Sequence, residues 1–148
     1  MSLMALIGCS VLLAGCASQS EVVFCPTISA PEEGARSFVR SDNTKQIFDI
    51  RLNGVNAVCT QHNSGGTMVA LSVGLKIKRS LAEGAENDVV AVPMMSAIVD
   101  ANQTVMSNQE FGYRVGFDKG SDSKFPVADI EQLVPADARL VISLRPAY

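Results

Sequence analysis

Few side chains in this sequence have the types and the spacing that catalysis requires. The sole histidine, His62, lies two residues before Ser64, and a nucleophile and a base this close in sequence cannot adopt the geometry of a catalytic triad. No G-x-S-x-G nucleophile elbow occurs in the chain. We therefore expect His62 at a polar hairpin tip, and the sequence predicts that the protein is not an enzyme.

Candidate metal ligands are equally sparse. The segment 118–123 superficially resembles a calcium loop, but it lacks the alternating carboxylates and the terminal glutamate that such a loop uses. Met94 and Met95 carry thioethers that suit Cu(I), yet neighbours on a strand point to opposite faces and cannot share one ion. The sequence predicts no metal and no cofactor.

Four cysteines are the remaining candidates for chemistry. Cys9 and Cys16 lie in an apolar amino-terminal stretch, whereas Cys25 and Cys59 lie downstream of it. In an oxidising compartment the downstream pair is expected to form a structural disulfide. The alternatives are two unpaired buried cysteines or a metal site, although His62 cannot complete a tetrahedral set with two thiolates alone.

The amino-terminal stretch resembles the signal of a bacterial lipoprotein. Residues 3–14 are apolar and uncharged, which is typical of a secretory signal and too short for a spanning helix of about 20 residues. Leu13-Ala14-Gly15-Cys16 then resembles a lipobox. This resemblance implies a signal peptide over 1–15, a diacylglyceryl group on Cys16 and a tether over 16–24. The alternative is a buried helix with two incidental cysteines.

The expected location follows from the same resemblance. Ala17, rather than an aspartate, follows Cys16, which implies lipid anchoring in the outer membrane with the domain facing the periplasm. The net charge of −3 and the lack of tryptophan argue against nucleic acid as a partner. We expect contact with the membrane through the lipid, and an envelope protein as the partner.

Downstream, the hydrophobic pattern has the period of two that is typical of β-strands. Residues 67–79 alternate aliphatic side chains with small or basic ones, and 111–117 and 140–144 follow the same pattern. Asn53-Gly54 is a predicted hairpin turn, and 81–86 and 129–133 are the only expected helical turns. About seven short strands predict an all-β, two-sheet immunoglobulin-like sandwich over residues 25–148.

Two further resemblances accord with this fold. Residues 130–144 resemble the corner before the penultimate strand of immunoglobulin-like and fibronectin-type-III-like domains, with Arg139 near the place of the usual tyrosine. The lipobox, Cys25-Pro26, the long strand ending in basic residues and the stretch 92–117 together resemble small outer-membrane lipoproteins of alphaproteobacteria. That group has no assigned activity, so the resemblance implies location and fold and carries over no functional residue.

Lys76, Lys78 and Arg79 are the candidate partner-binding residues, because they place positive charge along the outer side of one strand. They could instead bind anionic headgroups, or be the charges that keep an edge strand from pairing. The preferred function is a structural or protein-binding adaptor of the cell envelope, with this strand as an edge that accepts a partner strand. The alternatives are an accessory lipoprotein of a secretion or surface-appendage system, and an enzyme or solute binder, which would need a concave site.

Overall fold

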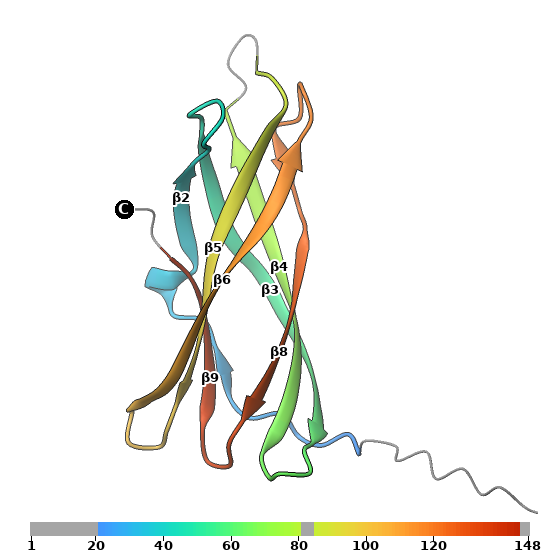
Figure 1. The fold of residues 1–148 in the computed structure, drawn as a ribbon, viewed down its shortest axis with the longest axis vertical. Helices are drawn as coiled ribbons and strands as arrows, with labels where there is room; N and C mark the ends of the chain where they lie inside the picture. The colour runs from blue at the N-terminus through green and yellow to red at the C-terminus, as the bar shows by residue number, and fades with distance from the viewer. Residues whose placement is uncertain (1–20, 81–84, 146–148) are drawn as a thin grey trace, which may run out of the picture.

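The domain consists of two β-sheets (Figure 1). The structure is a computed structural model that describes residues 21–80 and 85–145. The strands are β1 (Ile28–Ser29), β2 (Arg36–Arg40), β3 (Ile47–Gln61), β4 (Thr67–Arg79), β5 (Asp88–Val99), β6 (Val105–Phe117), β7 (Ser123–Lys124), β8 (Val127–Val134) and β9 (Arg139–Leu144). A short 3-10 helix, η1 (Glu32–Gly34), precedes β2. The prediction of an all-β, two-sheet fold is confirmed.

The two sheets have different strand orders. Sheet A has the order β2-β3-β4-β7, with β8 also beside β4, and sheet B has the order β1-β9-β5-β6. The residues described form nine strands rather than about seven, but β1 and β7 have only two residues each. The expected helical turn at 129–133 is wrong, because these residues lie in β8 and pair with β4. Most of the other expected turn, 81–84, lies outside the described residues.

The core lies between the sheets and is organised by β4. Its odd-numbered residues from Val69 to Ile77 are fully buried, and they join a cluster with Val92 and Met94 of β5 and side chains of β9. Phe48 and Phe117 pack within this cluster with ring centroids 5.0 Å apart. Burying one of the aliphatic side chains of β4 contributes about 1.5–3 kcal/mol to the free energy of folding. The alternation seen in the sequence therefore identifies the face of β4 that carries the core.

The expectation that β4 is an edge strand is wrong. β4 pairs with β3 along its length on one side, and with β8 and β7 on the other. The hydrophobic alternation reports which face of a strand is buried, and it contains no information about which backbone edges are paired. β4 is consequently unable to accept a partner strand where these pairs form.

Asn53-Gly54 is a bulge inside β3 rather than a hairpin turn. The pairing of β3 with β4 shifts between Leu52 and Val55, and Gly54 has a φ of 97°, which glycine adopts without strain. A Cβ at Gly74 on β4 would lie 2.6 Å from the carbonyl oxygen of Asn53. Glycine on both strands thus allows one long β3 where the sequence suggested two shorter strands.

Pro93 lies at the point where β5 loses one of its neighbours. β9 pairs with β5 only from Met94 to Val99, and the N–H of Arg145 donates to the carbonyl oxygen of Pro93 at 3.0 Å. The nitrogen of Pro93 therefore lies on the side of β5 where the pairing with β9 ends. A strand tolerates proline at such a position, because no ladder hydrogen bond from its N–H is needed there.

The amino-terminal end of the described chain is fixed to β3. Cys25 and Cys59 form a disulfide, as predicted. The N–H of Val23 donates to the carbonyl oxygen of Cys59, and the N–H of Gln61 donates to that of Glu21. Ordered pairing thus begins before the predicted domain boundary at residue 25. Residues 1–20, with Cys16 and the predicted signal peptide, lie outside the described residues, and no helix within 21–80 and 85–145 is long and apolar enough to cross a membrane.

We predict that the variant Cys25→Ala/Cys59→Ala unfolds with a free energy about 3–4 kcal/mol lower than the wild type, because the disulfide closes a loop between residues 34 positions apart. Denaturant unfolding of the oxidised protein measures this difference. Equal free energies for the variant and the wild type would show that the bond adds nothing to the pairing of residues 21–23 with β3.

Candidate functional site

A row of basic side chains crosses the outer face of sheet A. Arg36 of β2 lies directly opposite Arg51 of β3, and Arg51 lies opposite Lys76 of β4. In the next row, Asp49 lies opposite Lys78. We name these five residues the basic face. Like charges directly opposite one another destabilise a sheet, so the three cations of this row destabilise sheet A unless negative charge compensates them.

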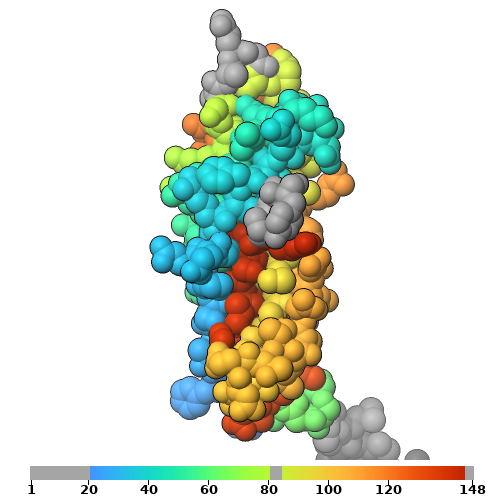
Figure 2. Space-filling view, turned by 90° about the vertical axis from the view of Figure 1, so that its left-hand side faces the viewer, coloured from blue at the N-terminus to red at the C-terminus, as the bar shows by residue number. Residues whose placement is uncertain are grey.

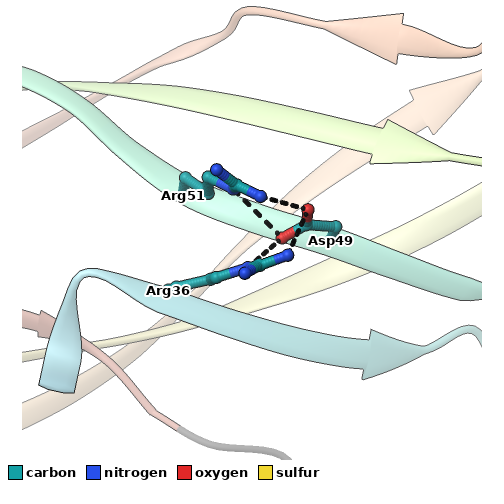
Figure 3. Close-up of polar contacts among 3 residues, drawn as sticks. All are labelled: Arg36, Asp49 and Arg51. Carbon is teal, nitrogen blue, oxygen red and sulfur yellow. Dashed lines mark hydrogen bonds and ion pairs between the residues drawn. The ribbon is translucent and has the colours of Figure 1, made fainter.

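Asp49 is the one carboxylate of the basic face. It accepts two hydrogen bonds from Arg36, at 2.8 and 2.9 Å, and two from Arg51, at 3.0 and 3.4 Å (Figure 3). The hydrogen bond from Arg36 is the main cause that lowers the pKa of Asp49, burial opposes it, and Arg51 adds to the lowering. Asp49 is therefore ionised at neutral pH and binds both guanidinium groups.

The two lysines have no such partner. Within the described ranges, neither Lys76 nor Lys78 takes part in an ion pair. The ammonium group of Lys76 lies 5.9 Å from the ring centre of Phe125. Because Asp49 balances only one of the four cations, the basic face has a surplus of positive charge although the whole chain is acidic.

Apolar side chains border the basic face. Phe38, Ile47 and Phe125 are 52%, 53% and 60% exposed, and the guanidinium of Arg36 lies 4.6 Å from the ring centre of Phe38. The hollow lined by Asp49, Arg51 and the two lysines measures only about 90 Å³. Small-molecule sites are usually clefts of about 300–1,000 Å³, so this hollow is smaller than a typical ligand pocket. The adjoining hollow, which Asp49 and Lys78 share with Phe38 and Ile47, measures about 320 Å³.

The expectation that Arg79 shares the outer face with Lys76 and Lys78 is wrong. Arg79 is 5% exposed, because the period of two places it on the same face of β4 as Ile77. Its guanidinium donates to the carbonyl oxygens of Ser121, Glu86 and Asp118 at 2.7, 2.8 and 2.7 Å. The parity of its position in the alternating strand was the signal that could have separated it from the lysines.

Arg79 ties together the connections at one end of the sheets. The three carbonyl oxygens belong to segments before β5 and after β6, and the guanidinium carbon lies 5.3 Å from the ring centre of Phe117. Burial opposes ionisation of the nearby Asp88, but hydrogen bonds from Thr44 and Ser41 and the charge of Arg79 outweigh it and lower the pKa of Asp88. Arg79 is thus a structural residue.

The other candidate residues have local structural contacts or lie outside the described part of the chain. His62 Nδ1 lies 2.7 Å from Ser64 Oγ and also accepts from the N–H of Ser64, so this pair stabilises the β3–β4 turn. Within residues 21–80 and 85–145, no group of three His, Cys, Asp or Glu side chains is arranged to hold a metal. Cys16 lies outside the described residues.

We predict that Arg79→Met lowers the free energy of unfolding by about 3 kcal/mol or more, because it leaves buried carbonyl oxygens without their charged donor. Lys78→Met is the matched change one residue earlier, on the outer face. It should alter the free energy of unfolding by no more than about 0.5 kcal/mol. Denaturant unfolding compares the two variants. Equal losses would contradict the separate roles of the two positions.

The ion pairs of Asp49 predict a pH dependence of stability. Because the pKa of Asp49 is lowered in the folded state, these pairs stabilise the fold above the unfolded pKa of about 4, and the stabilisation is lost as the pH falls through and below it. Asp49→Asn should therefore be less stable than the wild type at pH 7 by roughly 1 kcal/mol, and the difference should shrink towards pH 2–3. Urea unfolding across this range tests the sign, and a difference that does not change with pH would refute it.

Comparison with known proteins gives no match: no protein-family model, curated protein or solved structure is similar to this chain. The role of the basic face therefore has to be inferred from its own charges, burial and position.

Proposed function

We propose that this chain is a lipid-anchored lipoprotein of the outer membrane, facing the periplasm, whose two-sheet domain acts as an adaptor that binds an acidic surface of another envelope protein. The signal over 1–15 directs export and is removed, and the lipid on Cys16 and the short tether supply the anchor. The basic face supplies the contact. The single observation that carries the binding function is the row Arg36, Arg51 and Lys76, which lie directly opposite one another on three strands.

The position of β4 favours binding over protection of an edge. Positive charges that prevent edge-to-edge pairing are useful on an edge strand, whereas β4 has paired neighbours on both sides. Protection of β4 therefore does not account for Lys76 and Lys78. An acidic partner would offset the repulsion within the row, and the exposed Phe38 and Ile47 beside it would add apolar contact area.

The distance from the anchor favours a protein over the lipid surface to which the chain is tethered. The chain joins β3 beside Cys59, which lies opposite Val69. Lys76 lies seven residues further along β4, roughly 23 Å from that point at the rise of a β-strand. In Figure 1 the blue start of the described chain, residues 21–25, and the last residues of β4 lie at opposite ends of the domain. The basic face is thus displaced from the tether, towards components that lie away from the membrane.

We propose further that the fold is a variant of the immunoglobulin-like sandwich. Support comes from the path of the chain, which crosses between the sheets from β4 to β5 and again from β8 to β9. β4 and β8 are neighbours in one sheet, and β5 and β9 are neighbours in the other. This interlocked arrangement is the Greek-key feature of such sandwiches.

The variant Lys76→Glu/Lys78→Glu tests the adaptor function in cells that produce the full lipidated chain. Its captured envelope partner, recovered after cross-linking, should fall at least about tenfold, because two attractive contacts become repulsive. The control is Lys45→Glu/Lys119→Glu, which makes the same change of net charge at two lysines outside the basic face. Lys119 also loses its exposed ion pair with Glu86, and capture should stay unchanged. Equal capture by both double variants would exclude the basic face as the contact surface.

A further inference from the structure

β6 is a long strand with one open edge. It has 13 residues, and within the described ranges it pairs only with β5. Val105 and Met106 are 57% and 54% exposed. In Figure 2 the gold and orange residues of the β5–β6 hairpin and of β6 lie at the surface along one side of the molecule. Proteins ordinarily shorten, cover or interrupt such an edge, because it offers a row of unpaired backbone groups.

The hydrogen bonds of β5 determine which residues of β6 offer these groups. The carbonyl oxygen of Pro93 accepts from Arg145, so the backbone groups of Pro93 face β9 and point away from β6. Gly112 lies opposite Pro93. When two directly opposite residues of an antiparallel ladder are not hydrogen-bonded to each other, the backbone N–H and C=O groups of both point away from the partner strand. Gly112 therefore offers its N–H and C=O to the open edge, as do Glu110 and Arg114, two residues away on either side.

We propose that β6 pairs with β6 of a second copy of this chain, antiparallel, with Gly112 opposite Gly112 on the two-fold axis. Glu110 of each copy then lies opposite Arg114 of the other, so the edge is complementary in charge to itself. Phe111 of each copy lies opposite Tyr113 of the other, at the closely spaced positions where aromatic pairs contribute most. The two four-stranded sheets B become one continuous eight-stranded sheet.

Other alignments of the two strands are less favourable. The register of the two β6 strands can change only in steps of two residues. Residues whose N–H and C=O groups face the open edge must lie opposite residues of the same kind in the other copy. An axis at Glu110 places carboxylate against carboxylate, and an axis at Arg114 places guanidinium against guanidinium. An axis at Phe111 or Tyr113 places each charged side chain opposite glycine or an uncharged residue. Among these alignments, the axis at Gly112 is the one that pairs both charges with opposite charges.

Space and charge at the edge allow this contact. Gly112 is exposed, and a Cβ added there would meet nothing within 4 Å. Glu110 already receives Arg145 of its own chain at 2.5 Å and remains about half exposed. In the dimer Glu110 would lie between two cations. Because the contact is isologous, it closes with two copies and consumes the edge instead of extending into a fibre.

Charge exchange on the full chain tests the proposal, with mass measured by sedimentation in detergent. The wild type should be a dimer. Glu110→Arg and Arg114→Glu should each raise the dissociation constant at least about tenfold, because each creates two like-charge pairs. The double variant Glu110→Arg/Arg114→Glu should restore the dimer. Lys76→Glu/Lys78→Glu should leave it intact, so that this test is separate from that of the adaptor function.

Cysteine cross-linking tests the alignment. Gly112→Cys places one cysteine on the axis, opposite its counterpart in the second copy, and should yield a disulfide-linked dimer under oxidising conditions. Glu110→Cys and Arg114→Cys should cross-link when the two variants are mixed, and neither should do so alone. A wild type that sediments as a monomer, a dimer insensitive to both charge reversals, or cross-links at 110 with 110 would overturn the proposal.

Discussion

The alternation of β4 is the constraint on which the rest of the structure depends. β4 lies in the interior of sheet A, and all of its odd-numbered side chains from Val69 to Ile77 are buried in the core. The same period of two directs Lys76 and Lys78 outward. A shift of one residue would bury both lysines and expose the aliphatic side chains. The core and the basic face are therefore opposite sides of one strand, and neither can change position without the other.

Two different devices fix the ends of this arrangement. At one end, the Cys25–Cys59 disulfide and the pairing of residues 21–23 attach the incoming chain to β3. At the other end, Arg79 draws backbone carbonyl groups of the connecting segments around its guanidinium. The disulfide holds the chain that leads in from the tether. The buried guanidinium of Arg79 instead holds connecting segments through charged hydrogen bonds to their carbonyl oxygens. Between them, the outer face is left free for contacts.

The sequence predicted the features that depend on local pattern. The alternation over 67–79 predicted both the strand and its buried face, and the two cysteines downstream of the apolar stretch predicted the disulfide. The sequence did not predict which side chains lie side by side on neighbouring strands. Arg36 and Arg51 are far from Lys76 in the chain, and only the register of β3, with its bulge, places them in one row. Residues 129–133 form part of β8 instead of the expected helical turn, because pairing with β4 overrides a preference over so short a segment. The error at Arg79 arose from grouping charges by sequence proximity instead of by face.

Site-specific photo-cross-linking in intact cells would test most directly whether the basic face is the contact surface. A photoreactive side chain at Ile47, which is exposed beside Asp49 and Lys78, samples that face, and the same group at Asn102 samples the exposed turn after β5. We predict one dominant envelope protein with an acidic surface attached at position 47 and absent at position 102. The same set of proteins at both positions, or no protein at position 47, would contradict the account.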